Sequence, residues 1–204
     1  MTSPFHQIAP QYARLWSDTS RGRAQREQVW RETKDLFHPG DHVLDLGCGT
    51  GDDAVHLMSR GVKVLGIDSE PAMVEIAQAR GVDARQLAIE KVSSLDHLFD
   101  GVISNFGVLN CIANLGELSG DLSRLVRPRG MLALCVMSRF CWRVDWKHAV
   151  GRWSGHAVWR GIDVHYRTGR SIVQTFTPCF EFERRISIGN GDHQLLVFRR
   201  RREC

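Results

Sequence analysis

Short apolar runs and segments of helical periodicity alternate along most of the chain. Apolar runs of strand length occupy residues 42–46, 62–68, 82–87, 99–105 and 130–137. Between them, apolar residues recur at helical spacing in residues 52–60, 71–80 and 115–126. Strands that alternate with helices of this length are typical of an α/β fold, with a doubly wound, mostly parallel sheet and helices on both faces.

The two ends of the chain have different patterns. Apolar residues at helical spacing in residues 5–16 and 22–37 predict an N-terminal helical cap. Near the other end, two strand-like runs flank Asn190-Gly191, which is a strong signal for an antiparallel β-hairpin. We therefore expect one domain with a helical cap, a core, an aromatic-rich lid and a C-terminal hairpin, over residues 1–38, 39–137, 138–178 and 179–199.

Length and composition are those of an ordinary globular protein. The chain has 204 residues, of which 43% are hydrophobic and 25% charged, and this suits one domain with a sizeable core. No apolar run approaches the roughly 18–20 residues needed to cross a membrane. Residues 1–10 lack the layout of a secretion signal. The expectation is a cytoplasmic location without a membrane partner.

Cysteine spacing and charge narrow the possible partners. The six cysteines include no Cys-x-x-Cys pair, which argues against a zinc site and a disulfide framework and fits a reducing compartment. No metal is predicted. The net charge of +4 equals that of the run 199–202, four arginines, so the body is neutral and nucleic acid is not an expected partner. We interpret the arginine run as a solvated, frayed terminus.

A glycine-rich turn follows the first predicted strand. Gly47, Gly49 and Gly51 alternate with other residues, which differs from the Gly-x-Gly-x-x-Gly of dinucleotide-binding turns. Asp45 precedes them, and a carboxylate there would repel a pyrophosphate but attract a cation. Asp68 ends the next strand, where an acid accepts hydrogen bonds from ribose hydroxyls. The expected ligand is a nucleoside with a cationic, phosphate-free appendage.

These residues carry a resemblance to a known family. The run Asp45-Leu46-Gly47-Cys48-Gly49-Thr50-Gly51, with Asp68 after it, resembles the class I S-adenosylmethionine-dependent methyltransferases of small-molecule type. The likeness covers roughly residues 5–137 and includes Pro39-Gly40 and the turn 127–130. It implies a seven-stranded sheet whose last strand is antiparallel. It also implies S-adenosyl-L-methionine as methyl donor and S-adenosyl-L-homocysteine as product.

The resemblance also implies a set of cofactor contacts. Asp45 and the glycines would line the methionine and ribose portion, and Asp68 would take the ribose hydroxyls. The family's Gly-Asp-Ala after strand three is replaced by residues 86–90, so the acid that reads adenine is missing, and Glu90 or backbone groups are left to substitute. Arg26 shares nearly the same helix face as Arg23, and a solvated arginine is the alternative for both. The predicted cofactor residues are Tyr12, Arg23, Asp45, Gly47, Cys48, Gly49, Gly51, Asp68, Ser69, Met73, Ala88, Ile89 and Asn105.

Methyl transfer requires fewer catalytic groups from the protein than many other reactions do. It is an in-line displacement at a sulfonium, for which alignment in a water-poor site supplies much of the rate. A base is needed only when the acceptor must lose a proton. Weak candidates for a base are His148, His165 and Tyr12. For the acceptor we predict contacts with Phe106, Asn110, Trp142 and Trp146, although the two tryptophans equally suit packing of a lid helix.

The leading hypothesis is methylation of a small, apolar or aromatic metabolite at oxygen, nitrogen or carbon by a monomer or homodimer. One alternative is an RNA or protein methyltransferase, against which the neutral body counts. Another is a catalytically silent cofactor-binding partner protein, which the altered stretch 86–90 permits.

Overall fold

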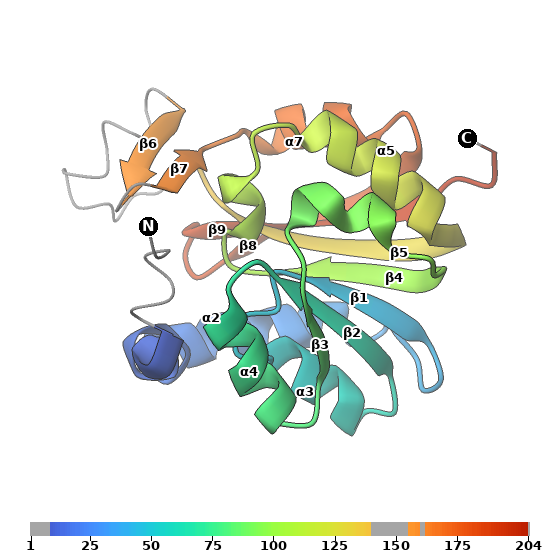
Figure 1. Cartoon of the computed structure of the whole chain (residues 1–204). Coiled ribbons are helices and arrows are strands. Elements are labelled where there is room, and N and C mark those ends of the chain that lie inside the picture. The colour runs from blue at the N-terminus through green and yellow to red at the C-terminus, as the bar shows by residue number, and fades with distance from the viewer. Residues whose placement is uncertain (1–8, 140–154, 160–161, 204) are drawn as a thin grey trace.

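A computed structural model describes residues 9–139, 155–159 and 162–203. Its centre is a seven-stranded sheet in the order β3-β2-β1-β4-β5-β9-β8 (Figure 1). The first five strands of the chain run parallel, whereas β9 is antiparallel to both β5 and β8. The predicted fold class is confirmed. The strands are β1 (His42–Leu46), β2 (Lys63–Asp68), β3 (Asp83–Gln86), β4 (Phe99–Ser104), β5 (Val126–Met137), β8 (Phe180–Ile188) and β9 (His193–Arg200).

Helices cover both faces of the sheet and bury a core on each. On one face lie α2, α3 and α4, and on the other α5, α7 and the short helix η3 (Figure 1). The larger core lies under α5 and α7 and includes Leu122 and Phe176, both fully buried. The helices are η1 (Ala9–Gln11), the π-helical turn η2 (Ala13–Ser17), α2 (Ser20–Thr33), α3 (Asp52–Ser59), α4 (Pro71–Ala79), η3 (Ile89–Ser94), η4 (Val108–Cys111), α5 (Leu115–Leu125) and α7 (Gly169–Phe176).

Polar side chains before the helices fix where several of them begin. The Asn114 side chain accepts the backbone N–H groups of Gly116 and Glu117, and so caps α5. For α4, the sequence suggests Ser69 as the N-cap, and this is wrong. Glu70 occupies the N-cap position without a side-chain cap. Its N–H is instead bound by the carboxylate of Asp68, at 2.9 Å.

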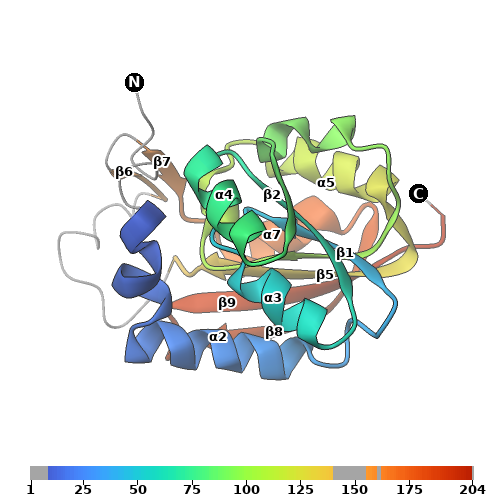
Figure 2. The ribbon, with the colours of Figure 1, turned by 60° about the horizontal axis from the view of Figure 1, so that its bottom comes forward.

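The C-terminal hairpin is the predicted one, but its end is not frayed. The turn 189–192 joins β8 to β9, and α2 runs alongside these strands (Figure 2). Arg200 belongs to β9, is only 8% exposed, and donates through Nε to the carbonyl of Ser123 at 2.9 Å. Arg201 donates to the carbonyl of Thr177. The expectation of a frayed terminus is therefore wrong for Arg199 and Arg200, which belong to β9, whereas Arg201 and Arg202 are exposed as expected of a solvated end. Arg200 ties β9 to α5, and Arg201 ties the chain end to the segment after α7.

The region predicted as a lid is only partly described. It contains the two-stranded antiparallel sheet of β6 (His156–Trp159) and β7 (Ile162–His165), besides α7. Trp142, Trp146 and His148 lie outside the described residues. Cys179 is disulfide-bonded, which contradicts the expectation of reduced cysteines at this position. Across the described ranges, none of the helices combines the length and apolar character required to cross a bilayer.

Candidate active site

The turn after β1 is closed on one side and open on another. Gly47, Gly49 and Gly51 have φ angles of 70°, 52° and 82°, a conformation that favours glycine. The N–H groups of Gly47 and Cys48 both bind the carbonyl of Ile67, which holds the turn against β2. A Cβ on Gly47 would lie 2.4 Å from the side chain of Val108, whereas one on Gly49 would meet no atom within 4 Å. Free space therefore adjoins the turn at Gly49.

Asp68 is attached to this turn. One carboxylate oxygen accepts the N–H of Gly49 at 2.9 Å, and the other accepts the N–H of Glu70 at the same distance. Burial raises the pKa of Asp68, although these backbone hydrogen bonds act in the opposite direction. Each oxygen of a carboxylate accepts more than one hydrogen bond. Asp68 can therefore support the turn and still accept hydroxyl groups of a ligand.

Two buried side chains next to the turn carry polar atoms that have no partner among the described residues. Asp45 is 2% exposed and lies in mid-sheet, opposite Gly66 on β2 and Ile103 on β4. Its Oδ2 has no hydrogen-bond partner within the described ranges, and neither amide atom of Asn105 has one. A buried polar atom left unpaired destabilises a fold by about 1–3 kcal/mol. Such atoms in one place indicate a ligand-binding site.

The charges around Asp45 also indicate a ligand-binding site. The pKa of Asp45 is raised well above its usual range, first by burial and then by Asp53, with Asp68 and Asp52 adding to the effect. Arg26 opposes the shift. A cation bound here would relieve the repulsion among the carboxylates and favour the ionised form of Asp45.

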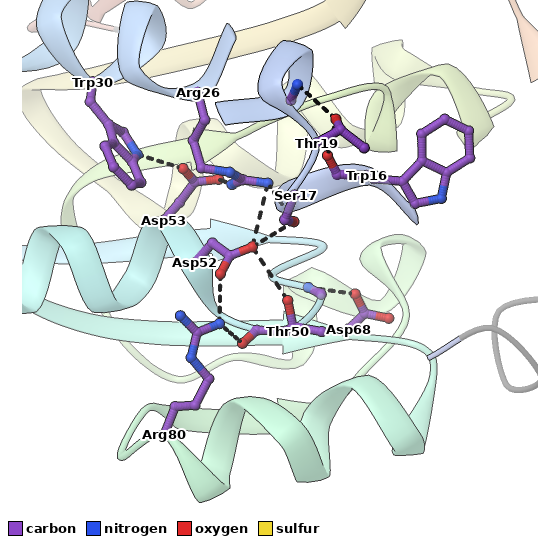
Figure 3. A network of polar contacts seen from close by, with 12 residues as sticks. Trp16, Ser17, Thr19, Arg26, Trp30, Thr50, Asp52, Asp53, Asp68 and Arg80 are labelled. Atoms are coloured by element: carbon purple, nitrogen blue, oxygen red, sulfur yellow. Dashed lines mark hydrogen bonds and ion pairs between the residues drawn. The ribbon is translucent and has the colours of Figure 1, made fainter. Parts of the chain in front are cut away.

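Arg26, on α2, faces this group of carboxylates (Figure 3). Its Nη1 donates to Asp53 at 2.6 Å, and its Nη2 lies 3.6 Å from Asp52. The guanidinium carbon lies 4.8 Å from the ring centroid of Phe106, a cation–π distance. Nε of Arg26 is buried without a partner among the described residues. Arg26 thus joins the N-terminal helix to both the turn and the end of β4.

This placement corrects the prediction for Arg23. Arg23 is exposed and lines an open cleft of about 270 Å³ between α2 and α3. Its side chain makes no hydrogen bond or ion pair with any residue that the structure describes. The two arginines are three positions apart on one helix, and the docking of α2 brings only Arg26 to Asp52 and Asp53.

Asp52 and Asp53 were missed by sequence reasoning. Oδ1 of Asp52 accepts Arg80 at 2.6 Å, and its Oδ2 accepts the hydroxyl of Ser17 at 2.8 Å (Figure 3). Asp53 accepts the indole N–H of Trp30 at 2.7 Å. The available signal was a pair of acids directly after Gly51, in the first turn of a helix. Acids there stabilise a helix by themselves, so the pattern alone did not indicate a network.

Comparison with known proteins agrees with this geometry. Residues 43–130, which include the turn, Asp68 and Asn105, match the methyltransferase domain family. The first strands and the glycine turn of this chain are therefore similar to those of a methyltransferase domain. Among curated relatives of this chain, the demethylmenaquinone methyltransferase of Symbiobacterium thermophilum is 29% identical over 162 residues, 70% of this chain and 64% of the relative. That of Thermus thermophilus is 35% identical over 138 residues, 64% of this chain and 62% of the relative.

Solved structures share the fold of this chain over most of its length. The N-methyltransferase NodS from Bradyrhizobium japonicum, in complex with S-adenosyl-L-homocysteine, superposes with a TM-score of 0.71 at 16% identity, over 97% of this chain and 99% of that one. An S-adenosylmethionine-dependent methyltransferase from Mesorhizobium loti gives 0.71 at 17% identity, over 89% and 100%. The chain spans just over three fifths of the length of the two curated relatives, at 64% and 62%.

Several predicted cofactor residues contribute packing or backbone groups. A Cβ on Gly66 would lie 2.9 Å from the sulfur of Cys48, so that side chain fills the space beside β2, and burial raises its pKa. Ile89 belongs to the buried core, and Ala88 precedes it at the start of η3. Met73 is buried on α4, whereas Ser69 is exposed.

Asn110 does not have the predicted role. It is 2% exposed, and its amide oxygen accepts the N–H of Met137 at 2.8 Å. Its amide nitrogen donates to the carbonyls of His165, at 2.9 Å, and Met137, at 3.4 Å. The side chain therefore ties η4 to β5 and β7. Both donors and one acceptor site of Asn110 are bound to the backbone, so this buried side chain serves to hold the fold together.

The remaining candidates differ in position. Burial raises the pKa of Tyr12, and Asp68 adds to the shift while Arg26 opposes it, so the phenol lies within the charged group at the turn. Phe106 has a φ of 56° and makes an edge contact with His193, at 5.5 Å between ring centroids. His193 is the first residue of β9, and the sequence pattern did not predict it as a site residue. His165 lies on the small second sheet, 5.3 Å from the ring of His156.

Proposed function

We propose that the protein transfers the methyl group of S-adenosyl-L-methionine to a small, apolar or aromatic acceptor. The observation that carries the proposal is the group of unpartnered buried atoms on Asp45 and Asn105, next to the open space at Gly49. A ligand that satisfies them must offer both donors and acceptors. An amino acid joined to a nucleoside does so.

The residues present suit the charges of this cofactor. Asp45 would face its cationic portion, and Asp68 would accept its ribose hydroxyls. Arg26 would hold its carboxylate through the buried Nε that lacks a partner in the described part of the chain. The excess of carboxylates over Arg26 favours a sulfonium cation over a neutral thioether. No acid follows β3 in the described turn before η3, so backbone groups near Ala88 would bind the adenine.

When bound, the cofactor supplies an electrophilic methyl group on a sulfonium. The protein's part is alignment and exclusion of water. Phe106, held in an unusual backbone conformation, presents its ring directly after β4 and against Arg26. Tyr12 closes the N-terminal side. No residue is assigned as a base, since an acceptor that is already nucleophilic needs none.

The acceptor class is supported by the curated relatives, whose name states demethylmenaquinone, a flat and largely apolar molecule. Support from this chain is the aromatic contact of Phe106 with His193 beside the site. An RNA acceptor receives no such support, and neither does a silent binding role.

Calorimetry and turnover test the proposal. The wild type should bind S-adenosyl-L-methionine and S-adenosyl-L-homocysteine, and it should form the latter when a panel of quinols, phenols and aromatic amines is supplied. Asp68→Asn should weaken binding about tenfold, through loss of a charged acceptor. Asp83 is exposed and its carboxylate accepts a hydrogen bond from Arg85, so it provides the control Asp83→Asn. Absence of binding to the wild type, or equal affinities of the two variants, would contradict the proposal.

A further inference from the structure

One buried hydroxyl joins the N-terminal segment to the glycine turn. The segment Ala9–Ser17, here called the strap, consists of η1 and η2. Its last residue, Ser17, is 8% exposed and donates to Oδ2 of Asp52 at 2.8 Å (Figure 3). Asp52 directly follows Gly51, the last glycine of the turn. The strap is therefore bonded to the turn at the point where α3 begins.

The acceptor side of this bond is firmly held. Arg80 lies just after α4. Its Nη1 donates hydrogen bonds to Oδ1 of Asp52, at 2.6 Å, and to the carbonyl of Thr50, at 2.7 Å. Burial tends to raise the pKa of Asp52, but Arg26, Arg80 and Ser17 outweigh it, and the net shift is downward. Asp52 is therefore ionised at neutral pH. A hydrogen bond from a hydroxyl to a carboxylate is roughly twice as strong as one between neutral groups.

The strap lies over the part of the site that would bind the ribose. η1 packs against α4, which follows Asp68. The phenol of Tyr12 interacts electrostatically with both Asp68 and Arg26. A ligand bound to Asp68 would therefore lie close to the strap, and movement of the strap would affect its release.

The joint between the strap and α2 suits a hinge. η2 is a π-helical turn, a rare conformation that is frequently found at functional sites. Thr19 then bridges the carbonyl of Trp16, at 2.8 Å, and the N–H of Gly22, at 3.0 Å. A Cβ on Gly22 would lie 1.9 Å from the Trp16 carbonyl oxygen, so a tight bend is built in here. The Ser17 hydroxyl adjoins this bend and fixes its angle.

We propose that Ser17 and Asp52 form a latch that holds the strap closed over the cofactor and slows the cofactor's release. The proposal rests on the proposed function for the identity of the ligand. Both are positioning residues, since they act through Tyr12 and do not touch the cofactor. Loss of the Ser17 hydroxyl should raise the dissociation rate constant about tenfold or more, as expected for one hydrogen bond to a charged group.

The test compares Ser17→Ala with Ser20→Ala. Ser20 is exposed at the start of α2 and its side chain makes no hydrogen bond with the described residues, so it controls for the substitution itself. Dissociation of S-adenosyl-L-homocysteine is followed by stopped-flow competition. Separately, trypsin cleavage after Arg14, an exposed residue within the strap, is followed by mass spectrometry on the ligand-free protein, because cleavage rate reports opening.

Ser17→Ala should accelerate both processes, and Asp52→Asn should do the same, while Ser20→Ala matches the wild type. Circular dichroism checks that each variant is folded. Rates for Ser17→Ala within twofold of the wild type in both assays would overturn the latch. A wild type that fails to bind S-adenosyl-L-homocysteine would instead contradict the proposed function, and cleavage of the ligand-free protein would still decide the latch.

Discussion

Asp68 accepts the backbone N–H of Gly49 at 2.9 Å, so the acid predicted to read a ribose also holds the glycine turn. Replacement by alanine removes this bond and the one from Glu70, and it leaves two partly buried N–H groups without an acceptor. We expect Asp68→Ala to lower the free energy of unfolding by about 2 kcal/mol. Urea denaturation at pH 7 measures it.

The matched variant is Asp68→Asn, which keeps one oxygen acceptor in place. This variant should lose clearly less stability than Asp68→Ala, but it should still bind the cofactor more weakly than the wild type does. Equal stability of the alanine variant and the wild type would show that the turn does not depend on Asp68.

The sequence was sufficient for the sheet and for the acids at its edge. Asp45 and Asp68 each end a short apolar run, and in a parallel sheet such ends lie together, so their proximity follows from local pattern. Arg26 could not be selected over Arg23 in this way. The choice depends on how α2 docks, and that docking uses distant groups such as the carbonyl of Ser187, which accepts from Gln28.

Contacts between segments that are far apart in the sequence also explain why the predictions for Asn110 and Arg200 failed. Asn110 has the residue type of a substrate contact, yet its backbone partners come from β5 and β7, which are far away in the sequence. Arg200 belongs to a run of like charges, which is typical of a solvated tail. In the structure its register against Phe180 brings it under the carbonyl of Ser123. Neither set of partners is visible in local periodicity.

Asp45 should make the ligand-free protein less stable as pH rises. Its pKa is raised in the folded state by burial and by Asp53. From the unfolded-state pKa of about 3.9 upward, the unfolded chain therefore loses a proton that the folded protein retains, so stability falls until the folded pKa is reached. Asp45→Asn cannot ionise. It should be more stable than the wild type by about 1 kcal/mol or more at pH 7.

Urea denaturation at pH 4 and pH 7 measures this difference, which should be smaller at pH 4. The same variant should bind S-adenosyl-L-methionine at least about tenfold more weakly in calorimetry, because an ion pair is lost. A variant less stable than the wild type at pH 7 would show that Asp45 is not strained by its charge.

Arg26 and Arg23 should differ sharply when replaced by alanine. Arg26→Ala leaves Asp52 and Asp53 without their shared cation, and the Arg26 side chain is only 14% exposed. Breaking such a pair destabilises a protein by about 3 kcal/mol. Arg23→Ala should change stability by less than about 0.5 kcal/mol, as is usual for an exposed site. Thermal denaturation measures both, and similar losses for the two variants would contradict the assignment of Arg26.

Alanine substitutions at Gly47 and Gly49 should differ in whether they affect the stability of the protein or its affinity for the cofactor. Both have positive φ, so alanine costs each about 1 kcal/mol in backbone conformation. At Gly47 the added methyl group also collides with Val108, at 2.4 Å, which should cost about 1–3 kcal/mol more. At Gly49 the methyl group enters open space beside the turn, where it would meet a bound cofactor. Gly49→Ala should therefore keep most of the stability yet lose affinity for S-adenosyl-L-homocysteine.

The control is a double-mutant cycle of Gly47→Ala with Val108→Ala. Removing the Val108 side chain makes room for the new methyl group, so the pair should be more stable than the sum of the two single changes predicts, by about 1 kcal/mol or more. Urea denaturation measures the cycle, and calorimetry measures S-adenosyl-L-homocysteine binding in parallel. Additive stabilities would show that the turn does not rest on η4, and unchanged affinity of Gly49→Ala would place the ligand elsewhere.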